Sequence, residues 1–402
     1  MWKLSIGLLM SGLVLLGIGH SLDVYGQVRK IVGTAADITP PPPPVGCTPA
    51  STFNIVTGTA VATYSTGGIS VDHAFDVATN YQNYIGAAFQ VGRDTTGAEL
   101  FIGSVIFSPT RFTASIEFST ANNPVISNTY ASVIDIENSR YLVHATRVVA
   151  PCAGTSCLQL LLYTTNDSTP TLVSDVTFSS INAGQASLGG IADDDYFYFF
   201  QRNSLGTLTN VFKFSKDSSL TFIESASIGN ISPTQMVDDG TFLYAVDVAG
   251  TRMLRINKSS LATQTLTAIT GISGTLVDQL AYDALNNHFY VATTSAGITT
   301  VRQLNATTLA GTGATNSLGT ETLVGGGILV DLVANKLYLA TDVTGTTSRL
   351  RRYALNTFGA EQTTSAVVGQ STLRAAQDYI HKRIWTSGIG SPGIVIPFTL
   401  CS

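Results

Sequence analysis

The chain has 402 residues, of which 44% are hydrophobic and only 12% are charged. A disordered chain is poor in apolar residues and rich in charge, so this composition excludes disorder as the overall state. The 21 basic and 26 acidic side chains give a formal net charge of −5. No basic excess is present to neutralise phosphates, which argues against a nucleic-acid partner.

The first 26 residues are predicted to be an export signal. Lys3 precedes an apolar run from Leu4 to Gly19 that is too short and too rich in glycine for a comfortable membrane span. Small residues suit cleavage before Gln27, and an uncleaved N-terminal anchor is the alternative. We therefore expect a secreted or cell-envelope protein on the extracellular surface, with no stable membrane span after cleavage.

Residues 27–46 are predicted to be a proline-rich linker. The five consecutive prolines from Pro40 to Pro44 favour the stiff, extended polyproline II form. The globular domain is therefore expected over residues 47–402. The segment 27–39, which precedes the prolines, is a candidate for self-assembly by adding a strand to a neighbouring molecule.

The chain after Cys47 consists of short apolar runs such as YIGAAFQVG, LQLLLYT and KLYLATD, separated by Gly, Asn, Asp, Ser and Thr. Their length and their β-branched and aromatic residues are typical of β-strands. No helical period extends over three turns. The sequence therefore predicts an all-β protein.

These predicted strands recur as a repeat. An aromatic residue anchors each unit, at Tyr198, Tyr244, Tyr290, Tyr338 and Trp385, with intervals of 46, 46, 48 and 47 residues. A period in the forties with about four strands per unit is typical of the blades of a β-propeller.

The last unit, which begins near Leu373, supplies only three strands. Phe53–Ala60 near the N-terminus has no local partner and can supply the missing one, which would also remove two open sheet edges. We therefore predict a seven-bladed β-propeller closed by an N-terminal strand that completes the last blade. Six or eight blades are the alternatives, because the first two units are irregular.

The four cysteines form an even set in a chain that is expected to be exported. Cys152 and Cys157 lie five positions apart in one loop, and Cys47 and Cys401 flank the two strands expected to share a blade. We predict disulfides between Cys47 and Cys401 and between Cys152 and Cys157. A zinc site is disfavoured and no metal is predicted, because no paired histidines accompany the cysteines.

Two of the predicted hairpins, DALNNHFY and DLVANKLY, explain their own residue types. Asp283 and Asp331 are expected to accept hydrogen bonds from backbone amides ahead of them, and an Asn closes each turn in the left-handed conformation. Because the acid recurs from unit to unit, a turn role is favoured over catalysis or calcium binding.

These hairpins, together with DYIHKRIW, resemble those of the broad YVTN/NHL-like group of secreted β-propellers. The resemblance covers nearly all of residues 53–402, and YVATT and YLATD are the nearest matches to the group's signature. It implies a ligand face formed by the loops between the second and third strands of each blade.

Those loops contain the charged residues of a predicted polar recognition surface. The candidates are Arg93, Arg147, Arg202, Asp247, Arg252 and Asp342. Arginine and carboxylate side chains form strong, directional hydrogen bonds with polar ligands. The alternative is that loops are simply where charges stay solvated.

No GxSxG elbow, HExxH pair, Walker loop or GxGxxG unit is found in the sequence, and no cofactor is predicted. We expect an exported, non-catalytic binding or scaffold module whose polar loop face binds an extracellular protein or a glycan. One alternative is a propeller enzyme of lyase or lactonase type, which the resemblance implies. Another is a structural subunit of a surface assembly.

Overall fold

The computed structural model describes strands and turns of the expected globular domain. The described residues are 55–57, 61–62, 70–80, 85–93, 100–108, 111–121, 126–135, 138, 140–147, 157–164, 171–182, 187–202, 208–231, 233, 235–343, 347–364, 367–368, 372–378, 383–388 and 394–400. The predicted signal peptide (1–26) and linker (27–46), with the segment 27–39 considered for self-assembly, lie outside them and remain predictions.

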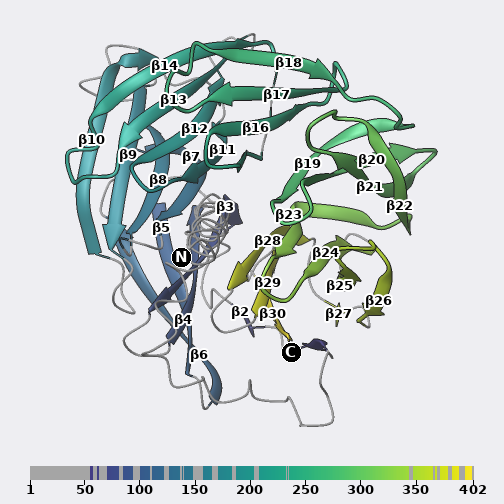
Figure 1. The fold of residues 1–402 in the computed structure, drawn as a ribbon. Helices are drawn as coiled ribbons and strands as arrows, with labels where there is room; N and C mark the ends of the chain where they lie inside the picture. Colours follow the sequence, from purple (N-terminus) through teal and green to yellow (C-terminus); the bar gives the residue numbers. More distant parts are fainter. Residues whose placement is uncertain are drawn as a thin grey trace, which may run out of the picture. The chain divides into compact units, whose positions relative to one another are not determined.

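Every regular element within the described residues is a β-strand, as predicted, and five of the sheets are four-stranded (Figure 1). The first two contain β3 (Ser70–Asn80), β4 (Ile85–Arg93), β5 (Leu100–Ser108) and β6 (Arg111–Ala121), then β7 (Ile126–Asp135), β8 (Arg140–Arg147), β9 (Cys157–Thr164) and β10 (Thr171–Asn182). The third contains β11 (Ser187–Ala192), β12 (Tyr196–Arg202), β13 (Thr209–Ser215) and β14 (Phe222–Gly229). The fourth and fifth contain β15 (Val237–Asp238), β16 (Phe242–Asp247), β17 (Arg252–Asn257) and β18 (Gln264–Ala268), then β19 (Thr275–Asp283), β20 (His288–Ser295), β21 (Ile298–Asn305) and β22 (Gly311–Gly319).

A ten-stranded sheet contains the remaining strands. They are β23 (Thr322–Asp331), β24 (Lys336–Asp342), β25 (Thr347–Ala354), β26 (Ala360–Thr363), β27 (Val367–Val368), β28 (Thr372–Asp378), β29 (Arg383–Gly388), β30 (Ile394–Leu400), β1 (Ile55–Thr57) and β2 (Val61–Ala62). A single bridge between Gly325 and Arg374 joins its two halves. The first half, β23–β27, follows the same strand order as the four-stranded sheets.

The N-terminal strands complete the second half of this sheet. β1 runs antiparallel to β30, with Ile55 opposite Leu400, and β2 pairs with the other end of the same strand. The predicted pairing of a strand within Phe53–Ala60 with the last strand of the chain is therefore present. This pairing brings the two ends of the domain into one sheet.

Successive sheets pack through their first strands. β7 contacts β3 and β11, β19 contacts β15 and β23, and β28 contacts both β23 and β3. Buried apolar clusters fill the junctions between neighbouring sheets instead of the centre of a single sandwich. This arrangement is that of a β-propeller. Side chains are described most fully along four consecutive blades, β11–β14, β15–β18, β19–β22 and β23–β26.

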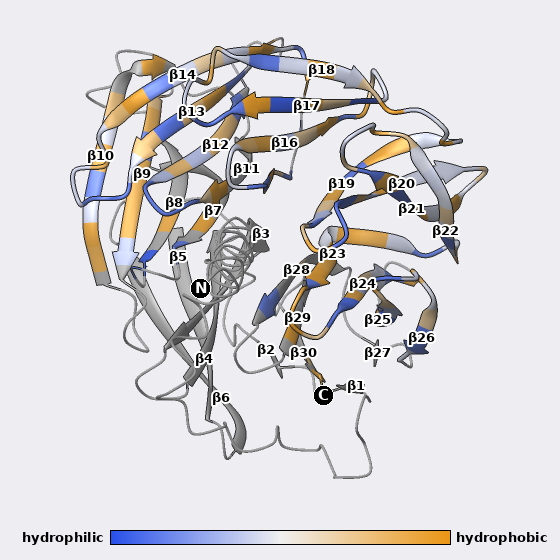
Figure 2. Ribbon diagram, in the orientation of Figure 1, coloured by the Kyte–Doolittle hydropathy of each residue, from blue (hydrophilic) through white to orange (hydrophobic). Residues whose placement is uncertain are grey.

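The aromatic residues that repeat in the sequence pack at these junctions between neighbouring sheets. The anchors Tyr198, Tyr244, Tyr290 and Tyr338 each lie in the cluster shared with the following blade. Neighbouring positions alternate, because Phe197 and Phe199 of β12 pack in the cluster shared with the preceding blade. The second strands β12, β16, β20 and β24 are therefore buried on both faces, which explains their continuous apolar runs; Figure 2 colours these strands by hydropathy.

The two predicted hairpin turns are confirmed. Asn287 and Asn335 adopt φ of 54° and 55°, the left-handed conformation that closes the turn. Oδ1 of Asp283 accepts hydrogen bonds from the backbone amides of Leu285 and Asn286 at 3.0 and 3.1 Å, and Asp331 accepts one from the amide of Ala334. These acids hold turns, as the sequence suggested.

Candidate functional site

Each blade has two ends. We call the end where the second strand meets the third the loop rim; its described residues include 202, 208–209, 247–252, 295–298, 342–343 and 347. We call the opposite end, where the first strand meets the second, the turn rim; it includes residues 192–196, 238–242, 283–288 and 331–336, with the turns that follow each third strand.

The predicted recognition residues all lie on the loop rim. Five of them end a second strand and the sixth begins a third strand: Arg93 (β4), Arg147 (β8), Arg202 (β12), Asp247 (β16), Asp342 (β24) and Arg252 (β17). The side chains of the first three lie outside the described part of the structure. Asp342 is buried. The structure brings only Asp247 and Arg252 into described contact with each other.

Asp247 and Arg252 form one ion pair across the β16–β17 hairpin. Nε and Nη2 of Arg252 donate to Oδ2 of Asp247 at 2.8 and 2.6 Å, and the amide of Gly250 donates to Oδ1 at 3.3 Å. The Asp247 side chain is 2% exposed and that of Arg252 is 43% exposed. The acid therefore holds the arginine, and the guanidinium is the group that faces solvent.

A second charged cluster on the loop rim was not predicted from the sequence. Glu321 is buried in the connection between β22 and β23, where Oε1 pairs with Nη2 of Arg351 at 2.8 Å and also accepts from Arg349. Thr341 donates to Oε2 at 2.7 Å. Burial favours a raised pKa for Glu321, but the hydrogen bonds from Arg351 and Thr341 outweigh it and hold the pKa below 4.5.

Arg302 is the fourth arginine held at this rim, and it was not predicted from the sequence either. Its Nε donates to Oγ1 of Thr293 and its Nη2 to Oγ of Ser273, both at 2.8 Å.

The residues that hold these arginines share a simple signal in the sequence. Asp247, Thr293 and Thr341 each follow an anchor tyrosine by three residues. Aligning the repeat by tyrosine and reading three residues further would have found them.

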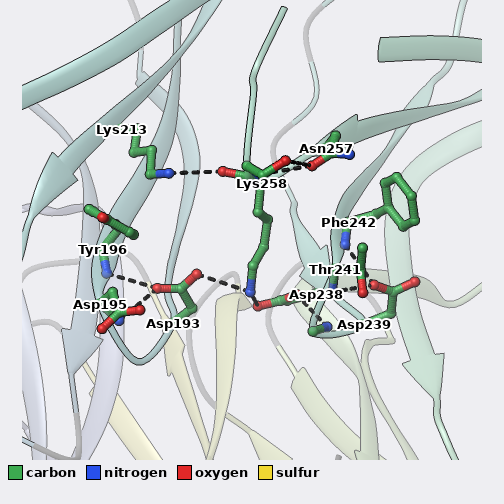
Figure 3. Close-up of polar contacts among 12 residues, drawn as sticks. Asp193, Asp195, Tyr196, Lys213, Asp238, Asp239, Thr241, Phe242, Asn257 and Lys258 are labelled. Atoms are coloured by element: carbon green, nitrogen blue, oxygen red, sulfur yellow. Dashed lines mark hydrogen bonds and ion pairs between the residues drawn. The ribbon is translucent and has the colours of Figure 1, made fainter. Parts of the chain in front are cut away.

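The turn rim contains a lysine, 14% exposed, between two carboxylates (Figure 3). Nζ of Lys258 lies 2.9 Å from Oδ2 of Asp193 in the preceding blade and 2.7 Å from Oδ2 of Asp238 in its own blade. Burial raises the pKa of Asp238, whereas at Asp193 the hydrogen bond from Lys258 outweighs burial and lowers the pKa. The pKa of Lys258 is raised, because both carboxylates outweigh its own burial.

A second lysine, Lys216, links its blade to the preceding sheet in the same way. Nζ of Lys216 lies 2.8 Å from Oδ1 of Asp135 in the preceding sheet and donates to the carbonyl oxygen of Asp193 at 2.6 Å in its own. Lys216 and Lys258 each follow a third strand by one residue. These charges join neighbouring blades, so we assign them to the frame and not to ligand recognition.

The described residues contain no group of three His, Cys, Asp or Glu side chains placed to hold a metal ion. No helix among them is long and apolar enough to cross a membrane. Cys157, at the start of β9, is buried and disulfide-bonded. Cys47, Cys152 and Cys401 lie outside the described residues, so both predicted pairings remain predictions.

No protein-family model matches this chain, and no curated protein matches it. Among solved structures, the chain is similar to a chain of the mitotic checkpoint complex, with 10% identity and a TM-score of 0.57 over 92% of this chain and 99% of that one. It is also similar to the WD40 domain of coronin from Toxoplasma gondii, with 8% identity and a TM-score of 0.52 over 87% of both chains. At these identities the likeness shows the fold alone, which is a β-propeller.

Proposed function

We propose that the protein is an exported, non-catalytic binding or scaffold propeller that presents its loop rim to an extracellular protein or a glycan. The main observation that supports this proposal is that arginines on the loop rim are held in place by other residues of the same chain. Arg252 is held by buried Asp247 yet remains 43% exposed. A side chain already fixed in one geometry loses less conformational entropy when a ligand binds, so this rim is suited to recognition.

We further propose seven blades of the YVTN/NHL-like type, closed by the N-terminal strand. The pairing of β1 with β30 and the contact of β28 with β3 support a closed succession of blades. The two halves of the ten-stranded sheet then count as separate blades, because only the bridge between Gly325 and Arg374 joins them. Closure removes exposed sheet edges that would favour aggregation.

The disulfide pairing tests this closure. We expect peptide mapping of the oxidised protein to recover Cys47 bonded to Cys401, and Cys152 bonded to Cys157. A free Cys47, or one bonded to Cys152 or Cys157, would contradict the proposed closure. N-terminal sequencing of protein secreted by the native host tests export in parallel, and the expected first residue is Gln27.

The binding function is tested with panels of extracellular-matrix proteins and glycans probed with the purified protein. The variant Asp247→Asn with Arg252→Gln removes the ion pair without leaving a buried unpaired charge, and we expect it to weaken the strongest interaction. The matched control, Asp217→Asn with Arg255→Gln, removes the same two charges from exposed positions outside the loop rim. Equal loss in both variants, or no interaction with any panel member, would contradict a loop-rim binding function.

A further inference from the structure

The two rims hold their charges in opposite ways. On the loop rim the buried members are acids, Asp247 and Glu321, and the arginines that pair with them are the more exposed partners. On the turn rim Lys216 is buried and Lys258 is only 14% exposed, whereas three aspartates are exposed: Asp194, Asp195 and Asp217. The loop rim therefore presents guanidinium groups to solvent, while the turn rim presents carboxylates.

Two consecutive blades carry three further arginines at or near the loop rim. Arg302 is bonded to two hydroxyl groups and so keeps its full charge. In the next blade, Arg349 and Arg351 share the single carboxylate of Glu321. The other acids here are Asp278 and Asp342, so acids and arginines are equal in number on these two blades, but Glu321 and Asp342 are buried and the two arginines beside Glu321 are more exposed than it is.

Two of the loop-rim arginines use only part of the guanidinium group for hydrogen bonds within the protein, and the other part can bind a ligand. In Arg252 and in Arg302, Nε and Nη2 donate to protein atoms, and no hydrogen bond from Nη1 is found among the described residues. A guanidinium edge of this kind matches the geometry of a carboxylate or sulfate group. Consecutive blades thus offer one oxyanion position each.

We propose that the loop rim of the blades β15–β18 and β19–β22 binds an acidic polysaccharide, with one carboxylate or sulfate group at each blade. This inference rests on the proposed binding function and names its ligand class. Packed sheets lie about 10 Å apart, whereas side chains on one face of an extended peptide repeat about every 7 Å. The wider interval suits a polysaccharide in which charged and neutral sugars alternate better than an acidic peptide.

Fluorescently labelled hyaluronate oligosaccharides, in which carboxylates alternate with neutral sugars, are the probe, and dextran of equal length is the neutral control. We expect hyaluronate to bind more tightly than dextran by fluorescence anisotropy, and its affinity to fall as salt is raised. Arg302→Gln removes a charge without leaving a buried acid, and we expect it to weaken binding about fivefold. Arg255→Gln, an exposed arginine of β17 lying over Phe242, should leave the affinity unchanged.

Three results would overturn the inference. They are equal binding of dextran and hyaluronate, equal weakening by Arg302→Gln and Arg255→Gln, and tighter binding of poly-L-glutamate than of hyaluronate at matched charge. The last result would assign the rim to acidic peptides. If the ligand class fails while the panels still show binding lost on removal of the Asp247–Arg252 pair, the proposed function stands without this inference.

Discussion

Two junctions between blades use different chemistry at the same position. At the junction of β11–β14 with β15–β18, the residue after the third strand is Lys258, which pairs with Asp193 and Asp238. At the junction of β19–β22 with β23–β26, the corresponding residue is Leu355, which is fully buried in an apolar cluster. One junction is therefore ionic at the turn rim and the other is apolar.

In both junctions the backbone carbonyl of this residue accepts a hydrogen bond from a side chain of the preceding blade. Nζ of Lys213 donates to the carbonyl oxygen of Lys258 at 2.8 Å, and the hydroxyl of Tyr290 donates to the carbonyl oxygen of Leu355 at 3.0 Å. Burial raises the pKa of Tyr290 to about 12, so this hydroxyl keeps its proton at neutral pH. The comparison shows that the carbonyl provides the constant link, while the side chain at this position is free to be charged or apolar.

The ionic junction should show the largest response to a single substitution. Lys258→Met keeps most of the side-chain volume but leaves the carboxylates of Asp193 and Asp238 without their cation. We expect the free energy of unfolding to fall by about 4 kcal/mol, the cost of breaking a buried ion pair on one side. Denaturant unfolding at neutral pH measures it, and a loss below about 1 kcal/mol would show that these carboxylates are well solvated.

The apolar junction should lose slightly less. Leu355→Ala removes buried methyl groups from the cluster that contains Tyr290 and Phe358, and we expect a loss of about 3 kcal/mol. Unlike the loss at Lys258, this one should not change with salt concentration. Asn356→Ala, on the exposed neighbouring residue, is the control and should leave the unfolding free energy within about 0.5 kcal/mol of wild type.

Alkaline pH should separate the two junctions. The pKa of Lys258 is raised above 10.5 in the folded protein, so its charge stabilises the fold fully below pH 10.5 and loses that effect as pH rises through the folded pKa. The stability difference between wild type and Lys258→Met should therefore shrink toward zero at alkaline pH. The difference between wild type and Leu355→Ala should stay constant across the same range, and a parallel decrease there would contradict the assignment.

Removing all three charges of the ionic junction should have the smallest effect. In the variant Lys258→Met with Asp193→Asn and Asp238→Asn, no buried charge is left unpaired. We expect unfolding free energy within about 1 kcal/mol of wild type, because replacing a whole buried ion group costs far less than breaking it. A triple variant no more stable than Lys258→Met would show that these acids stabilise their turns independently of the lysine.

The sequence was sufficient for features that repeat along the chain. The anchor tyrosines, the left-handed Asn287 and Asn335, and the pairing of the two ends all follow from local residue types and a fixed period. The loop rim was also placed correctly, because the ends of strands follow from the same repeat.

The ion pairs between charged residues could not be predicted from local residue types or from the repeat. Lys258 and Asp193 lie 65 positions apart and meet only because two blades pack in one register. Glu321 lies in a connection outside the repeat, so nothing local linked it to Arg351. Of the predicted rim residues, Asp247 is buried and holds Arg252, which is 43% exposed, and the sequence alone did not indicate which of the two would be buried.

The pairing of β1 with β30 places the first and the last strand of the domain in one sheet. A circularly permuted chain could therefore join Leu400 to Ile55 through a short linker and begin instead at the exposed turn of Ala296 and Gly297, which connects β20 to β21. Every strand would keep its neighbours, because the order of strands in space does not depend on where the chain starts.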